Sequence, residues 1–112
     1  MDEGCIKKFE KEKDKITNNK TKTGSGGGIY AYGNLIVSGK NTLISGNIAQ
    51  TYGGGLMVKT TGSFNGGEIS NNQAITYAGG GIRVDGKFTY NSGTIKENTA
   101  GTTGGGIDFS SG

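Results

Sequence analysis

Residues 79–107 read GGGIRVDGKFTYNSGTIKENTAGTTGGGI and contain one full unit of a repeat, from one glycine triplet to the next. A triplet followed by Ile or Leu also begins at Gly26 and Gly53, so that four triplets start 27, 26 and 25 residues apart. Collagen would need glycine at every third position. A phased period of this length is instead typical of solenoids and other repeat architectures.

The residues after each triplet alternate between apolar and other side chains, as in Ile82-x-Val84 and Ile107-x-Phe109. A period of two predicts a β-strand and not a helix. The segments between these strands are rich in Gly, Asn and Ser, which bend the chain at low steric cost. The repeat therefore predicts an all-β fold, a right-handed parallel β-helix (solenoid) of about three rungs.

A second signal, Ile-x-x-Asn-x-Ala, places Asn47, Asn72 and Asn98 at equivalent positions in successive units. In a stack of units these side chains form a column. Each amide has both a donor and an acceptor, so the amides can bond from rung to rung. Asparagine also tolerates the left-handed backbone of a tight bend. We interpret these three residues as structural.

The same stacking aligns the outward positions of the strand after each triplet into two columns. Opposite charges meet in them, Lys59 with Asp85 and Arg83 with Asp108, and such contacts contribute about 0.2–1 kcal/mol each. They help to fix the register. The two columns are Tyr30, Met57, Arg83 and Asp108, then Tyr32, Lys59, Asp85 and Ser110.

The sequence changes character near residue 25. Residues 1–25 contain seven lysines and five acidic residues but few large apolar side chains. Ile6 and Phe9 have the spacing of one helical face. We interpret residues 1–25 as a charged lead-in or cap that is helical or disordered, and residues 26–112 as the β-helix repeats, with units starting at 26, 53, 79 and 104.

Composition excludes several kinds of chemistry. The chain has 24 glycines among 112 residues, no histidine, and a single cysteine, Cys5. Histidine-based catalysis, an internal disulfide and a multi-cysteine metal site are therefore excluded, and we expect no cofactor or metal. The net charge of +3 is too small to indicate a nucleic-acid partner. No apolar run is long enough for a membrane span, and none has the pattern of a signal peptide.

The stretch from Gly79 to Ile107, with its triplet, apolar strand and Ile-x-x-Asn-x-Ala, resembles the repeats of right-handed parallel β-helix surface proteins. These include polymorphic outer membrane protein-type repeats and the adhesin-like repeats of Gram-positive bacteria and archaea. The resemblance extends over residues 26–112, with Ile where the Phe of Phe-x-x-Asn is usual. It implies that the chain is a non-catalytic structural or adhesive segment with an extracellular or cell-surface location. It also implies that the chain is a fragment of a longer repeat protein.

The outward columns contain a candidate ligand face formed by Tyr30, Tyr32, Met57 and Lys59. Aromatic and basic side chains on a rigid sheet suit weak, multivalent contact with a host or environmental glycan or a surface protein. A face that only keeps the solenoid soluble is the alternative. The last repeat ends on an open strand edge, which predicts end-to-end self-association.

Some β-helix proteins are enzymes, so a fragment of a carbohydrate-active enzyme similar to a polysaccharide lyase is the alternative function. Such a site needs clustered carboxylates. The acids beyond residue 25 are Glu68, Asp85, Glu97 and Asp108, and no two of them share a column. We therefore expect no catalytic residue.

Overall fold

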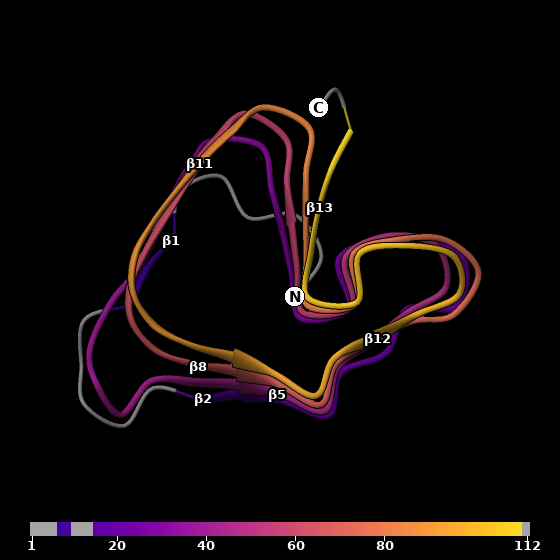
Figure 1. Ribbon diagram of the computed structural model, residues 1–112, viewed down its shortest axis with the longest axis horizontal. Coiled ribbons are helices and arrows are strands. Elements are labelled where there is room, and N and C mark those ends of the chain that lie inside the picture. The colour runs from indigo at the N-terminus through magenta and orange to yellow at the C-terminus, as the bar shows by residue number, and fades with distance from the viewer. Residues whose placement is uncertain (1–6, 10–14, 111–112) are drawn as a thin grey trace.

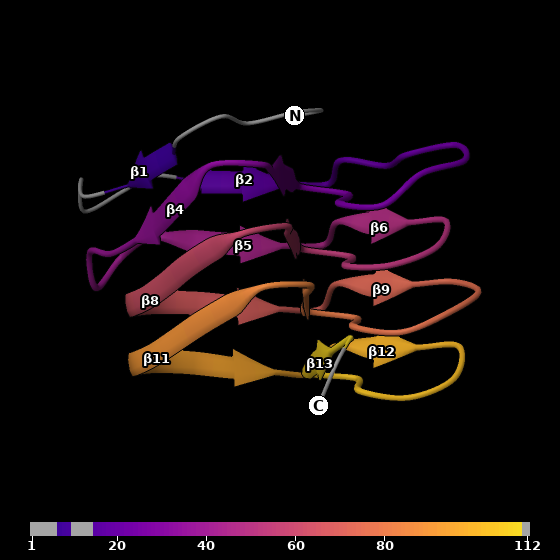
Figure 2. The same cartoon turned by 90° about the horizontal axis from the view of Figure 1, so that it is seen from above.

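The computed structural model describes residues 7–9 and 15–110 and shows a parallel β-solenoid of about four turns, here called coils (Figure 1). Successive coils lie directly beside one another along the axis (Figure 2). The strands are β1 (Lys7–Phe9), β2 (Lys15–Thr17), β3 (Ile29–Ala31), β4 (Asn34–Val37), β5 (Leu43–Ser45), β6 (Ile48–Ala49), β7 (Leu56–Val58), β8 (Thr61–Ser70), β9 (Gln73–Ala74), β10 (Ile82–Val84), β11 (Lys87–Lys96), β12 (Thr99–Ala100) and β13 (Ile107–Phe109).

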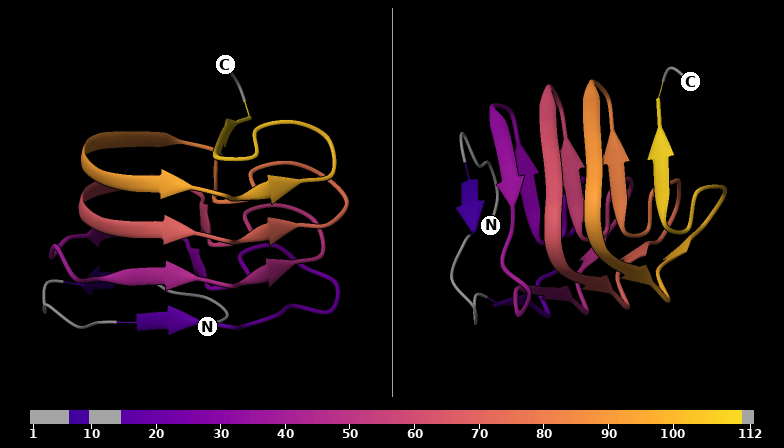
Figure 3. Two further views of the ribbon diagram at one scale, coloured as in Figure 1. Left: turned by 60° about the horizontal axis from the view of Figure 1, so that its bottom comes forward. Right: turned by 60° about the vertical axis from the view of Figure 1, so that its left-hand side comes forward.

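The strands form three parallel sheets in which neighbours come from successive coils (Figure 3). Sheet A has the order β13-β10-β7-β3, and sheet C has the order β12-β9-β6. Sheet B contains β1, β2, β4, β5, β8 and β11. Each coil passes from sheet A to B to C and returns through a lateral loop. The lateral loops are residues 20–25, 50–52, 75–78 and 101–103.

The predicted register is confirmed in sheet A, where Ile29, Leu56, Ile82 and Ile107 are paired in one column. The first three are fully buried, whereas Ile107 in the last coil is only partly buried. The core is thus a continuous apolar stack along the axis. Its buried members are Ile29, Ala31, Leu35, Val37, Ile44, Leu56, Val58, Phe64, Ile69, Ile82 and Val84.

The prediction for residues 1–25 was wrong where the structure tests it, because residues 7–9 and 15–17 are strands and no helix occurs in the described residues. β2 pairs with β5, and Lys20 bridges to Ile48, so the solenoid begins before the first glycine triplet. The weak helical pattern does not decide the structure of residues 15–17, because the edge of β5 is available for pairing and β2 forms a parallel ladder with it. About four coils are therefore present instead of three. Cys5 and Ile6 lie outside the described residues.

Two different physical demands explain the glycine triplets. The first glycine of each has a positive φ, between +62° at Gly104 and +76° at Gly79, which disfavours other residues. At the third position the coils approach too closely for a side chain. A Cβ on Gly55 would lie 2.7 Å from the carbonyl oxygen of Gly81 in the next coil. The triplets therefore both turn the corner and permit close stacking.

Candidate functional site

The asparagine column runs through the coils as an unbroken chain of amide hydrogen bonds. The Nδ2 of Asn47 donates to the Oδ1 of Asn72, and the Nδ2 of Asn72 donates to the Oδ1 of Asn98, both at 3.0 Å. The same bond joins Asn19 to Asn47, so the column has a fourth member that the sequence reasoning missed. The Oδ1 atoms of Asn47, Asn72 and Asn98 each also accept the backbone N–H of the column asparagine in the preceding coil. These bonds explain the residue type without a ligand.

The residue before each column asparagine has a left-handed backbone. Asn18, Asn71 and Glu97 have φ between 54° and 58°, and Gly46 has φ of 70°. Glycine and asparagine accept this conformation readily, but glutamate does not. The repeat of Asn or Gly before the column was readable in the sequence as a marker of this bend. Glu97 is the one member of the set that the bend disfavours.

The charges of sheet A form a small network on its outward side. Lys59 Nζ lies 2.7 Å from Asp85 Oδ2, Arg83 Nε lies 3.2 Å from Asp85 Oδ1, and Arg83 Nη1 lies 2.9 Å from Asp108 Oδ2. Both predicted pairs are thus present, and Arg83 joins them. Partial burial acts to raise the pKa of Asp85, but the hydrogen bonds from Lys59 and Arg83 outweigh it and lower that pKa. Asp85 is therefore ionised at neutral pH and is poorly suited to act as a general acid.

The predicted ligand face is only partly available. Tyr32 is 52% exposed, and Tyr30 is half-buried with its ring centroid 5.1 Å from that of Tyr32. Met57 lies in the predicted outward column, but it is only 4% exposed, so little of its side chain is accessible to a ligand. In its column it lies between Tyr30 and Arg83. Lys59 is accessible but held in the ion pair with Asp85, and that hydrogen bond raises its pKa despite partial burial.

The lateral loops explain why part of this face is covered. They curve back beside the outward side of sheet A, as Figure 1 shows near β13. The Arg83 guanidinium lies 4.2 Å from the ring centroid of Tyr52, which in turn stacks on Tyr77 at 5.0 Å. Cation–π and stacking contacts of this kind stabilise a loop against a sheet. The alternation of residues within one strand carries no information about such a loop.

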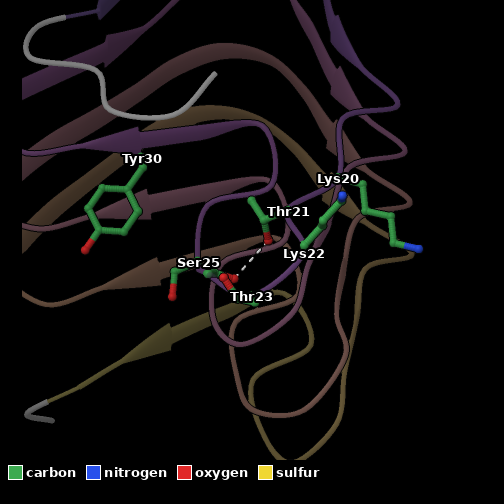
Figure 4. A pocket seen from close by; sticks show the side chains of 7 residues that line it. Lys20, Thr21, Lys22, Thr23, Ser25 and Tyr30 are labelled. Carbon is green, nitrogen blue, oxygen red and sulfur yellow. Dashed lines mark hydrogen bonds between the residues drawn. The ribbon is translucent and has the colours of Figure 1, made fainter.

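A pocket of about 380 Å³ opens between the first lateral loop and Tyr30. Ser25 precedes the first triplet, where the next coil has Tyr52, so no aromatic ring from this loop fills the space. In Figure 4 the hydroxyl side chains stand between the Tyr30 ring and the two lysines. Partial burial and a hydrogen bond with Tyr32 raise the pKa of Tyr30, which stays protonated at neutral pH. The lining residues are Lys20, Thr21, Lys22, Thr23, Gly24, Ser25 and Tyr30.

Among the described residues, no group of three or more Cys, Asp or Glu side chains is placed to hold a metal ion. Residues 7–9 and 15–110 also contain no helix with the length and apolar character needed to cross a bilayer.

Part of the chain matches a known protein family. Residues 15–32 match the Chlamydia polymorphic membrane protein repeat. The matched segment contains Ile16-x-x-Asn19 and the first glycine triplet, the same kinds of element as those that carry the sequence resemblance at residues 79–107. The resemblance to this repeat is therefore confirmed, in a segment that starts before the predicted boundary at residue 26. No match was found among curated proteins or among solved structures.

Proposed function

We propose that this β-solenoid with a polymorphic membrane protein-type repeat is a non-catalytic adhesive segment of a cell-surface or secreted repeat protein, and that it binds acidic glycans. The observation that carries the proposal is the Tyr30–Tyr32 pair beside a pocket lined by lysines. Aromatic rings offer flat apolar faces of the kind on which sugar rings pack. A rigid sheet that presents them needs little ordering on binding.

The polar side of the pocket supports an acidic ligand. Residues 15–25 contain Lys15, Lys20 and Lys22 but no acidic residue. The Thr21 hydroxyl donates to the Gly24 carbonyl and accepts from the Gln50 backbone N–H, and the Ser25 hydroxyl bonds to Thr51. Each oxygen can still accept a hydrogen bond from a sugar hydroxyl, whereas the acidic group of the ligand would be bound by the lysines. Exposed lysines attract carboxylate or sulfate groups in a salt-dependent manner. A neutral polysaccharide would use the rings but gain nothing from the lysines.

The acids outside this pocket support the non-catalytic part of the proposal. Asp85 and Asp108 share Arg83 as a partner, and Asp85 also binds Lys59. Glu68 accepts a hydrogen bond from Ser70. A hydrolase or lyase fragment would need a free carboxylate pair at a cleft, whereas the pocket itself is lined by no acid.

The test is binding to immobilised heparin and sialylated mucin, with dextran as the neutral comparison. Tyr32→Ala should weaken binding to the acidic polymers by about tenfold. Tyr90→Ala is the matched control, because Tyr90 is also 52% exposed but lies in sheet B and stacks on Phe64. It should bind like the unsubstituted chain.

A second pair of variants tests the charge. Lys22→Gln should weaken binding and reduce its salt dependence, whereas Lys87→Gln, an exposed lysine of β11, should not. Equal binding to dextran, equal effects of the two tyrosine variants, or no binding to either acidic polymer would contradict the proposal. Release of reducing ends or unsaturated products from the polymers would instead establish the enzyme alternative.

A further inference from the structure

We infer that the lateral loops of the middle coils form a second glycan site, which binds an uncharged, extended polysaccharide along the solenoid axis. The site, here called the lateral face, lies at the opposite side of the coils from the bends of β8 and β11 (Figure 2). It is separate from the pocket at Tyr30, which the first lateral loop lines. The residues of the lateral face are Gln50, Tyr52, Gln73, Ile75, Thr76 and Tyr77.

Charged residues are absent from this part of the sequence. Residues 41–58, 69–82 and 98–107 contain no Lys, Arg, Asp or Glu, and they include sheet C and the lateral loops of three coils. The first lateral loop differs, because residues 20–25 contain two lysines. A carboxylate or sulfate on the lateral face would lose hydration without gaining a counter-charge. The face therefore favours an uncharged ligand.

The loop after β9 brings apolar side chains to the surface. It has four residues before the triplet, 75–78, whereas the loops of the two neighbouring coils have three, and it extends beyond both of them (Figure 2). Ile75 is 39% exposed and Tyr77 is 44% exposed. The Tyr77 N–H donates to the Thr51 carbonyl, and the Tyr77 carbonyl accepts from the Thr102 N–H. Both neighbouring coils thus cover this loop along the axis, so its exposure is sideways and does not arise at an end of the stack.

The Tyr77 ring is held in place before any ligand binds. It stacks on Tyr52, with ring centroids 5.0 Å apart and an angle of 15° between the planes. The Arg83 guanidinium lies 4.2 Å from the Tyr52 ring centroid and is itself held by Asp85 and Asp108. A ring fixed in this way loses little freedom on binding. It offers a flat apolar surface of the kind on which a sugar ring packs.

Amide and hydroxyl groups accompany the two rings. The Nε2 of Gln50 donates to the Oγ1 of Thr76 at 3.2 Å, across two lateral loops. Gln73 is exposed in β9. These side chains combine donors and acceptors, as the hydroxyl groups of a neutral sugar do. The lateral face can therefore hydrogen-bond an uncharged glycan as well as pack against it.

The spacing of the coils determines the form of the ligand. Equivalent positions in successive coils lie about 4.8 Å apart along the axis. A β-1,4-linked glucan is a straight ribbon that advances by a similar distance per sugar, so neighbouring sugars can contact neighbouring coils. Dextran is α-linked and flexible and does not keep this spacing. It therefore remains the neutral comparison for the acidic-glycan pocket.

A protein partner would need a larger apolar surface. Specific protein interfaces bury about 800 Å² on each side, around an apolar centre. Ile75 and Tyr77 are the large exposed apolar side chains of the lateral face as the structure describes it. Two such side chains, with amides and hydroxyls beside them, match the contact area of a few sugars.

Isothermal titration calorimetry with cellohexaose measures the binding. Isomaltohexaose is the matched ligand, because it has the same number of glucose units in α-1,6 linkage. Cellohexaose should bind with an affinity that does not change with salt, and isomaltohexaose should not bind. Cellobiose spans too few coils and should bind at least about tenfold more weakly than cellohexaose.

Substitutions locate the site. Tyr77→Thr introduces the residue that the last coil has at this position, Thr102, and should weaken cellohexaose binding by about tenfold. Gln73→Ala leaves the ring stack intact and should weaken it by about threefold. Tyr32→Ala is the matched control, because Tyr32 is 52% exposed but lies outside the lateral face. It should bind cellohexaose like the unsubstituted chain. Circular dichroism and the urea midpoint check that each variant is folded.

Three results would overturn the inference. They are the absence of cellohexaose binding, equal affinity for cellohexaose and isomaltohexaose, and equal losses in folded Tyr32→Ala and Tyr77→Thr proteins. The two glycan sites are tested separately, because binding to the acidic polymers depends on Tyr32 and Lys22 and binding to cellohexaose on Tyr77 and Gln73. Binding of the acidic polymers without binding of cellohexaose would overturn this inference and leave the acidic-glycan proposal standing.

Discussion

Replacement of Asn72 by alanine tests whether the asparagine column stabilises the solenoid. Asn72 is 1% exposed, and its side chain takes part in four hydrogen bonds. Its Oδ1 accepts from the backbone N–H and the Nδ2 of Asn47, and its Nδ2 donates to the Ile44 carbonyl and to Asn98 Oδ1. Alanine removes all four. Asn98 Oδ1 keeps one donor, the backbone N–H of residue 72.

The expected loss follows from the groups that remain without this partner. They are the Asn47 N–H, one Nδ2 hydrogen of Asn47 and the Ile44 carbonyl, all enclosed between coils. A buried polar group without a partner costs about 1–3 kcal/mol. Three such groups at the low end of that range, with a small cavity, predict a loss of about 4 kcal/mol in the free energy of unfolding. For a domain with a total of about 5–15 kcal/mol, this is a large fraction.

The assay is equilibrium unfolding in urea, followed by circular dichroism at a concentration where the chain is monomeric. Asn98→Ala is the matched control. It also removes acceptor bonds from Asn72 and a donor bond to Ile69, but Asn98 lies in the last coil, where it is only partly buried and water can replace the lost partners. Its loss should be about 1–2 kcal/mol. Equal losses for the two variants, or a loss below about 1 kcal/mol for Asn72→Ala, would refute the reasoning.

Two further predictions concern single positions of the coil. Glu97→Asn should raise the free energy of unfolding in urea by about 0.5–1 kcal/mol, because asparagine adopts the left-handed backbone of this position with less strain than glutamate. Lys96→Asn is the control and should give no such gain. The Lys59–Asp85 pair should show a coupling of about 0.2–1 kcal/mol in a double-mutant cycle with Lys59→Gln and Asp85→Asn, reduced in concentrated salt. Because the pKa of Asp85 is lowered, this contribution should be present above about pH 4 and be lost as the pH falls further.

The fold could be predicted from the sequence because its two signals are local and phased. The triplets mark where the coils touch, and the period of two marks the strands, so the sheet A register and both ion pairs could be read directly. The start of the solenoid was missed for an equally local reason. Ile16-x-x-Asn19 is followed by Thr21 where the later units have Ala. It lies in a segment of lysines and threonines, and the first glycine triplet of the given sequence comes after it, at Gly26.

The candidate site was harder to predict because it depends on contacts between elements. Met57 has the outward position that alternation predicts, yet its side chain is buried. It lies on the outward side of sheet A, which the lateral loops approach (Figure 1). The pocket at Tyr30 is lined by the first lateral loop, which has Ser25 where the next coil has Tyr52. Neither fact follows from a strand pattern. Comparison of the loops at equivalent positions would have identified the second.

Equivalence of the coils gives the protein a natural increment of length. Removal of residues 53–78 would join residue 52 to Gly79, and the retained unit would bring Ile82, Val84 and Asn98 to the places of Leu56, Val58 and Asn72. The apolar core and the asparagine column would remain continuous across the deletion, whereas the lateral loops and the side chains that they expose would change. Gain or loss of whole units by recombination can therefore diversify the surface of such a protein without a search for a new fold.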